Sequence, residues 1–280
     1  MKHLIKSVIT KFIVGSVAVV ALNQSAIAAP ELTKIEFWDA RDEQSTEVVD
    51  HSAWQALLNV YLDDQHASGI NRFDYKSVSK EDVKKLDGYL DYLQSVKPRQ
   101  LNTKEQFAYW VNLYNAQTVD FIIEGVQEDD IKSIKEIRSL FVVPGPWKRT
   151  ELKIEGKKVS LDNIEHGILR PIWLDHRIHF SVNCASIGCP NLLKTAFTAS
   201  NADDLLDIAE EEFLQHPRAV RLQGDKVVIS SLLNWYGDDF AETPSEMYDY
   251  LSDFVSPEII DALAEEPNVV YDYDWSLNAP

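Results

Sequence analysis

Cysteine is scarce in this 280-residue chain, which contains only Cys184 and Cys189. Any thiol, disulfide or sulfur–metal chemistry must therefore involve residues 179–190, which hold both cysteines and His179. Several enzyme motifs are missing altogether: the chain has no G-x-S-x-G, no Walker loop, no glycine-rich dinucleotide turn and no H-E-x-x-H. No cofactor is expected from these patterns.

Basic residues are also few, since 27 lysines and arginines face 45 aspartates and glutamates and give a net charge of -18. A chain this acidic repels nucleic acid and anionic membrane surfaces, so neither is an expected partner. The exception is a basic cluster that we interpret as the solvated face of a hairpin, formed by Lys148, Arg149, Lys153, Lys157 and Lys158.

A long hydrophobic run is absent, because the most apolar segment covers only residues 12–22. A membrane-spanning helix needs about 20 such residues. Lys2, Lys6 and Lys11 precede the run and small residues follow it, which is typical of a secretory signal peptide over residues 1–28. We therefore expect an exported protein, periplasmic or extracellular, with no membrane attachment after cleavage.

No linker rich in glycine, serine or proline divides the chain, and it has no low-complexity tract or internal repeat. About 250 mature residues can form a substantial core in one domain. We expect an irregular lead-in over residues 29–50, followed by a single domain over residues 51–280.

Hydrophobic spacing and capping residues predict mainly helices with a few short strands. Helices are expected from Ser52, from Ser79 and from Asn102 to Gly125, then over 160–171, 205–213 and 231–240, and after Pro244 and Pro257. Hairpins are expected over 152–159 and 220–229, with single strands over 178–183 and 269–271. This pattern fits an α+β fold with a small mixed or antiparallel sheet.

The helix from Asn102 carries two asparagines three positions apart, Asn112 and Asn115, which share one face beside Tyr114 and Trp110. Asparagine is a poor helix former, so its presence inside a helix asks for a reason. One interpretation is a buried polar network; the other is an amide that orients a substrate or a catalytic group.

Residues 179–190 allow three interpretations. In the first, Cys184 is a nucleophile at the end of a strand, with His179 or His166 as its base. Asn112, Asn115 or Glu165 would then orient the imidazole. Glu165 and His166 are adjacent, and neighbours on a helix point about 100° apart, so their spacing alone does not make a carboxylate–histidine pair.

In the second interpretation Cys184 and Cys189 form a disulfide, which an exported protein permits. Such a short loop gives a chain-entropy stabilisation of only about 2 kcal/mol. The pair could also act in redox exchange, although its spacing differs from that of thioredoxin-like motifs. In the third interpretation zinc is bound by His176, His179, Cys184 and Cys189, in a spacing that matches no standard site.

The chain resembles domain-of-unknown-function family 547. The resemblance rests on residues 107–116 (FAYWVNLYNA), 164–170 (IEHGILR) and 179–190 (HFSVNCASIGCP), with 235–236, 239–240 and 273–278 also fitting. It implies that Asn112, Asn115, Glu165, His166, His179 and Cys184 form one site. It supplies no reaction.

The resulting hypothesis is a Cys184-dependent hydrolase or acyl transferase that acts on an amide or ester of a small molecule or peptide. Substrate contacts are expected from Trp110, Tyr114, Asn115 and Asn183. Both candidate histidines precede the cysteine, which departs from the order in papain-like and transglutaminase-like enzymes. The alternative is a non-catalytic binding module in which a Cys184–Cys189 disulfide shapes a loop.

Overall fold

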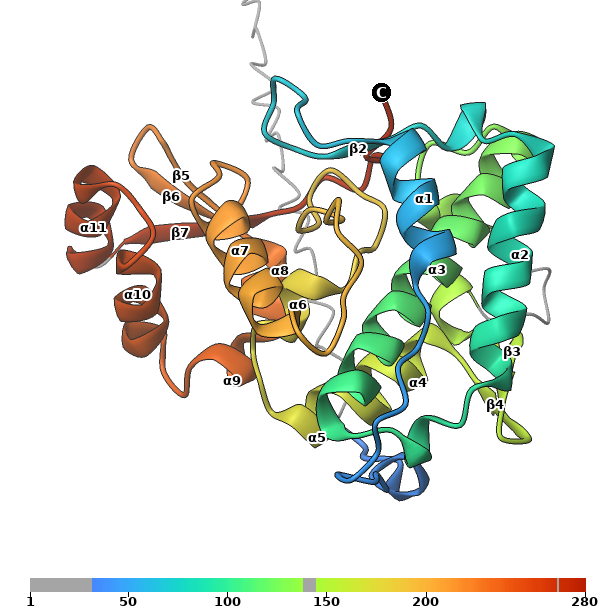
Figure 1. Ribbon diagram of the computed structural model, residues 1–280. Helices are drawn as coiled ribbons and strands as arrows, with labels where there is room; N and C mark the ends of the chain where they lie inside the picture. The colour runs from blue at the N-terminus through green and yellow to red at the C-terminus, as the bar shows by residue number, and fades with distance from the viewer. Residues whose placement is uncertain (1–31, 138–144, 266) are drawn as a thin grey trace, which may run out of the picture.

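The computed structural model describes residues 32–137, 145–265 and 267–280 (Figure 1). The predicted signal peptide, residues 1–28, lies outside these ranges. Within them, no helix combines the length and the apolar character needed to cross a membrane.

Three helices form an N-terminal layer, as expected: α1 (Ser52–Tyr61), α2 (Lys80–Ser95) and α3 (Thr103–Asp129). They lie together on one side of the molecule (Figure 1). The side chains of Ser79 and Asn102 cap α2 and α3 by accepting backbone N–H groups in the first turn. We expected Ser52 to cap α1, but Ser52 is the first residue of the helix. Its N–H donates to the Asp50 carboxylate at 2.9 Å.

Helix α3 is the centre of the core. It is buried on nearly all sides along its first turns, and the tryptophan on it, Trp110, has no exposed surface. It continues past Gly125, where we expected it to end, and stops at Asp130, which has a left-handed backbone (φ 51°). A helix buried all round must sit between other layers, which here are α2 on one side and the segments that form the site on the other.

The strands are short, and they confirm an α+β fold. Strand β1 (Leu62–Asp63) pairs with β2 (Arg72–Phe73), and β3 (Leu152–Ile154) with β4 (Lys157–Val159). The hairpin of β5 (Val220–Gln223) and β6 (Lys226–Ser230) is extended by β7 (Asn268–Asp272), which runs parallel to β6. This mixed sheet lies on the side away from α2 (Figure 1).

The helix expected over 160–171 is interrupted by a π turn. Ser160 caps α4 (Leu161–Ile164) in a capping box, the π segment η6 (Glu165–Leu169) follows, and α5 (Arg170–Trp173) ends it. We expected Pro171 to end the helix, but it lies inside α5. A proline lacks the N–H that would bond to Gly167 O, and here the Ile35 N–H bonds to that carbonyl instead, at 2.8 Å.

The strand predicted over 178–183 is wrong: Ile178–Ser181 forms a short helix, α6. The alternation of apolar and polar residues suggested one buried and one open face. All four residues are buried, including His179 and Ser181 at 2% and 4% exposed, so the alternation carried no information about burial.

The C-terminal part is helical around the mixed sheet. It contains α7 (Ala202–Leu214), α8 (Ser231–Trp235), α9 (Gly237–Phe240), α10 (Pro244–Ser252) and α11 (Pro257–Ala264). Helices α8 and α9 replace the single helix expected over 231–240. Helix α10 begins, as predicted, with Thr243 at the N-cap and Pro244 in the first turn, and Thr243 also forms a capping box. Short 3-10 turns cover Glu36–Trp38 (η1), Tyr75–Ser77 (η2), Pro98–Gln100 (η3), Ile134–Glu136 (η4) and Pro146–Lys148 (η5).

After β7 the chain returns across the molecule to the N-terminal layer. Ser276 O accepts the Ile187 N–H at 2.8 Å, and the Leu277 N–H donates to Lys132 O at 2.9 Å. Asn278 accepts both the Phe73 N–H, at 2.9 Å, and the Tyr75 hydroxyl, at 2.7 Å. This tail therefore joins the cysteine loop to the segments around the C-terminal end of α3.

Candidate functional site

A cavity of about 460 Å³ brings together the π segment, α6, the cysteine loop, α8 and the C-terminal tail. Its walls are largely aromatic, and its ionisable groups come from a few positions. The lining residues are Tyr114, Lys135, Gly145, Trp147, Lys148, Asp162, Glu165, His166, His179, Val182, Cys184, Cys189, Leu232, Trp235, Tyr236, Tyr273 and Trp275. Glu165, His166, His179 and Cys184, predicted from the sequence to share one site, all line it.

The two histidines are linked through a buried ion pair. Asp239 Oδ2 accepts from His179 Nε2 at 2.7 Å and from Arg170 Nε at 2.6 Å. The Arg170 guanidinium also lies 3.1 Å from His166 Nδ1. Burial would raise the pKa of Asp239, but these hydrogen bonds from His179 and Arg170 hold it far below its usual range. Asp239 is therefore ionised at neutral pH.

These contacts assign the same tautomer to the two rings, with the proton on Nε2. Burial lowers the pKa of His179, against the opposing effect of Asp239 and Glu165, so its imidazole is neutral. Its Nε2 proton points to Asp239, which leaves Nδ1 as an acceptor. That atom is buried and has no hydrogen-bond partner among the residues that the structure describes. Arg170 can only donate, so Nδ1 of His166 accepts, and its Nε2 carries the proton.

Glu165 lies between the two rings. Its Oε1 is 3.8 Å from His166 Nδ1 and 3.9 Å from His179 Nδ1, both longer than a hydrogen bond. The Tyr114 hydroxyl donates to its Oε2 at 3.0 Å. Burial, and then the nearby Glu165 carboxylate, raise the pKa of Tyr114 well above its usual value, so this hydroxyl keeps its proton. The carboxylate is thus held in place while one oxygen still faces the imidazoles.

Aromatic rings form the remaining walls. Tyr236 stacks on His179 with ring centroids 4.1 Å apart, and so covers the imidazole. Trp275 packs against Trp235 at 5.6 Å and Tyr273 at 4.6 Å. Trp147 meets Trp275 edge-on at 6.1 Å. Such walls offer a large apolar surface to a ligand.

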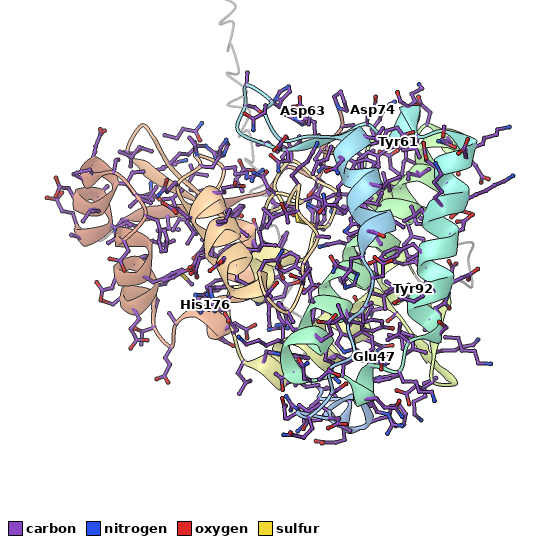
Figure 2. All side chains as sticks on the ribbon, viewed as in Figure 1. Glu47, Tyr61, Asp63, Asp74, Tyr92 and His176 are labelled. Carbon is purple, nitrogen blue, oxygen red and sulfur yellow. A yellow bond between two sulfur atoms is a disulfide. The ribbon has the colours of Figure 1, made fainter. Side chains whose placement is uncertain are left out.

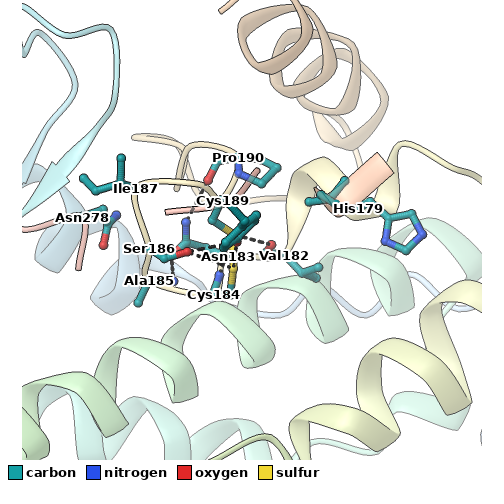
Figure 3. The surroundings of a disulfide bond; sticks show 12 residues. His179, Val182, Asn183, Cys184, Ala185, Ser186, Ile187, Cys189, Pro190 and Asn278 are labelled. Atoms are coloured by element: carbon teal, nitrogen blue, oxygen red, sulfur yellow. Dashed lines mark hydrogen bonds between the residues drawn. A yellow bond between two sulfur atoms is a disulfide. The ribbon is translucent and has the colours of Figure 1, made fainter. Parts of the chain in front are cut away.

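The two cysteines lie as a disulfide pair, with their Cα atoms 6.0 Å apart (Figure 3). Cys184 is half-buried and Cys189 is 2% exposed. Cys184 Sγ lies 2.9 Å from the Tyr273 hydroxyl, and the Cys184 N–H donates to Cys189 Sγ at 2.9 Å. Figure 3 shows the His179 ring turned away from the sulfurs. Its hydrogen bond goes to Asp239, so no Cys184–His179 pair forms in this state.

The cysteine loop is shaped by Asn183. Its side chain donates to Pro190 O at 3.0 Å and accepts the Ala185 N–H at 2.7 Å. Ala185 has a left-handed backbone (φ 56°), which this local hydrogen bond stabilises. The Asn183 side chain does not line the cavity.

The helix asparagines bind backbone groups. Asn112 donates to Phe197 O at 2.7 Å and accepts the Phe197 N–H at 3.1 Å. Asn115 likewise bridges Ser181 O and the Asn183 N–H, at 2.9 and 2.8 Å. Both are buried, and each amide binds one backbone C=O and one backbone N–H, which agrees with the polar-network interpretation. Neither lines the cavity.

Of the four side chains expected to contact substrate, Tyr114 alone is among the described lining residues of the cavity. Trp110 is buried and packs edge-on against Trp38, with ring centroids 5.2 Å apart. The zinc interpretation also finds no support: His176 bonds to Glu210 at 2.8 Å near α7 (Figure 2). Across residues 32–137, 145–265 and 267–280, no three histidine, cysteine or acidic side chains gather as a metal site would require.

Sequence reasoning missed Arg170, Asp239 and the tryptophan wall as parts of the site. Asp239 and the tryptophans come from segments far from residues 165–184, so no local spacing connects them to the site. Arg170 lies four residues after His166 on the same helical stretch, a spacing that places the two side chains together. All except Trp147 lie in the segments that carry the family resemblance, which was the signal that could have indicated them.

Comparison with known proteins supports that resemblance. Residues 98–214 match the family described as "Protein of unknown function, DUF547". The match includes α3, the π segment and the cysteine loop, but not the segments from 235 onwards. No curated protein and no solved structure matches the chain.

Proposed function

We propose that this chain, whose residues 98–214 match the DUF547 family, is an exported hydrolase or acyl transferase that acts on an amide or ester in the aromatic cavity. The observation that carries the proposal is the placement of Glu165. Its carboxylate lines the cavity and lies within 4 Å of one nitrogen of each imidazole. Carboxylates and imidazoles in such a pocket are suited to general acid–base catalysis.

In the proposed reaction Glu165 accepts a proton from a water molecule as the water oxygen attacks the carbonyl carbon. The Nε2–H of His166 donates a hydrogen bond to the carbonyl oxygen as negative charge develops there. The intermediate then collapses, the bond to the alcohol or amine breaks, and that leaving group takes the proton from Glu165. The products are a carboxylic acid and an alcohol or amine, and an acyl transferase would use an acceptor hydroxyl or amine in place of water.

His179, Arg170 and Tyr114 are positioning residues in this scheme. Tyr114 fixes one oxygen of Glu165, and the Asp239–His179 pair places an uncharged imidazole beside the other. Arg170 fixes the tautomer of His166 and so places the ring proton on Nε2, the nitrogen that does not face the guanidinium.

A second candidate keeps the thiol chemistry predicted from the sequence. The observation that favours it is that Cys184, the more exposed of the two cysteines, lines the same cavity as Glu165. A thiol reductant would convert the disulfide to two thiols and release Cys184 as a nucleophile. The two candidates therefore differ in whether activity needs reduction.

The test uses a series of p-nitrophenyl esters and the matching p-nitroanilides, with release of the chromophore as readout. Glu165→Gln should reduce kcat by about 100-fold or more. Glu128→Gln, an exposed residue at the end of α3, is the matched control and should keep full activity. Wild-type protein that turns over no ester or anilide, or a Glu165→Gln variant as active as the control, would contradict the proposal.

The role of the cysteines is tested in the same assay with Cys184→Ser and the Cys184→Ser/Cys189→Ser double variant. Acid–base catalysis by Glu165 predicts that both retain activity, and that added reductant changes little. The thiol candidate predicts activity only after reduction and its loss in both variants. Intact mass of the unreduced protein, lighter by two hydrogens when the bond is present, reports the state of the pair.

A non-catalytic binding module is the outcome in which the cavity binds these compounds without turning them over. Export is tested separately. The proposed signal peptide predicts that the protein recovered outside the cytoplasm begins near residue 29, and a mature protein that retains residue 1 would exclude cleavage.

A further inference from the structure

Two lysines stand at the mouth of the aromatic cavity. Lys135, in η4, and Lys148, in η5, line it and are exposed to solvent. Lys135 Nζ lies 4.3 Å from the ring centre of Trp275, a cation–π contact with the wall. Within the described part of the chain, neither ammonium group forms an ion pair with a carboxylate.

Other described lysines, such as Lys84 and Lys104, also form no ion pair, but Lys135 and Lys148 are the two described lysines that line the cavity. Acidic residues outnumber lysines and arginines 45 to 27, so nearby carboxylates are plentiful. Other cationic side chains, such as Arg177 and Lys85, form ion pairs with two or more of them. Lys148 acts on Asp162 only through its field, which opposes the burial that raises the pKa of this carboxyl.

The cavity is therefore polarised. Glu165, which is 6% exposed, marks its buried end, whereas the two exposed lysines mark its solvent end. The other carboxylate of the lining, Asp162, is half-buried and lies in the field of Lys148. A negative group on a ligand would be repelled by Glu165 and attracted by the lysines. The tryptophan and tyrosine walls between these ends suit an apolar or aromatic body.

We propose that the substrate carries a negatively charged group, such as a carboxylate, joined through an apolar or aromatic body to the bond that reacts. The charged group binds at Lys135 and Lys148, the body lies against Trp235 and Trp275, and the amide or ester reaches Glu165. This rests on the proposed function for the position of the reacting bond, but the charge preference itself is a property of binding.

Binding is measured by calorimetry with three probes of equal shape: naphthalene-2-carboxylate, naphthalene-2-carboxamide and 2-naphthylmethylammonium. The carboxylate should bind more tightly than the amide, and the ammonium compound most weakly. Exposed ion pairs contribute up to about 1 kcal/mol, so Lys135→Met and Lys148→Met should each weaken carboxylate binding by about 2- to 5-fold. Methionine keeps the apolar stem, so amide binding should change little.

Lys158→Met is the control, because Lys158 is exposed in strand β4 and does not line the cavity. The preference for the carboxylate should remain in this variant, disappear in the double variant Lys135→Met/Lys148→Met, and weaken as salt is raised. Equal binding of the three probes, no binding of any, or a preference that survives in the double variant would overturn the inference.

The two proposals fail separately. In Glu165→Gln, loss of ester turnover with the carboxylate still preferred over the amide supports both. A preference for the carboxylate in a protein that hydrolyses no ester contradicts the proposed reaction and leaves the anionic ligand standing. Hydrolysis of neutral and anionic esters with the same KM contradicts the anionic substrate alone.

Discussion

Asp239→Asn removes a charge that His179 and Arg170 share at the back of the cavity. Asp239 accepts at 2.7 Å from the first and 2.6 Å from the second. The side chain of Arg170 is 5% exposed and that of Asp239 is 16% exposed, so water screens this ion pair little. A hydrogen bond to a charged group contributes about 1.5–3 kcal/mol. Both bonds end on Oδ2, and an asparagine amide oxygen can accept both, but without the charge each is weaker by about 1–1.5 kcal/mol. We therefore expect a loss of about 2–3 kcal/mol of unfolding free energy.

The matched control is Asp238→Asn. Asp238 is the preceding residue in the same first turn of α9, but it is exposed and has no ion pair in the described structure. Both variants lose one negative charge near the same helix N-terminus, so their difference isolates the contacts of Asp239. Urea unfolding followed by tryptophan fluorescence should place the Asp239→Asn midpoint lower by about 1 M.

The pH dependence has a definite sign. The pKa of Asp239 is depressed in the folded state from an ordinary value of 3.8. A depressed carboxyl stabilises the fold above the unfolded pKa, and this contribution is lost as pH falls below it. The gap between wild type and Asp239→Asn should be constant at neutral pH and shrink below pH 3.8. Equal midpoints for the two variants, or a gap that widens in acid, would refute the reasoning.

Three further predictions concern residues outside the reacting groups. Burial lowers the pKa of His51 from 6.5 to about 4, so the unfolded state binds a proton that the folded state does not between these pH values. As the pH falls from 6.5 to 4, wild type should therefore lose about 3 kcal/mol of unfolding free energy from this residue, and His51→Gln should show a smaller loss by urea unfolding. Gly188→Ala would put a Cβ 2.9 Å from Asp274 N, and should lower the unfolding free energy by about 1–3 kcal/mol; an unchanged midpoint would contradict this close approach. Asn112→Ala leaves two buried backbone groups of Phe197 unpaired and should cost about 3 kcal/mol in the same assay, whereas a cost below about 1 kcal/mol would show that they find other partners.

The fold was predictable from the sequence wherever a local signal agreed with the tertiary environment. The caps at Ser79, Asn102 and Ser160 and the proline at 244 place four helix starts correctly, because capping depends on residues within one turn. The strand over 178–183 was not predictable in this way. Its period-two pattern is real, but the surrounding layers bury both sets of residues and the chain turns into a helix.

The site was predictable in part. Glu165, His166, His179 and Cys184 do share one cavity, and the family resemblance indicated this grouping. The roles of the asparagines could not be derived, because whether an amide binds a ligand or a backbone group depends on which segment packs against it. Phe197 and Asn183 approach Asn112 and Asn115 from 85 and 68 residues away, and no spacing in the sequence shows this.

The C-terminal tail has a consequence for the order of folding. Tyr273 and Trp275 form part of the cavity wall, and Leu277 and Asn278 bond back to segments near residues 73, 132 and 185. Contacts of such long range are closed late, after the entropy of a large loop has been overcome. During synthesis the N-terminal helices can form as soon as they emerge, but the cavity stays incomplete until residues 273–278 have left the ribosome. A chain interrupted before residue 273 would retain Glu165, His166 and His179 but lack Tyr273 and Trp275, which complete the aromatic wall.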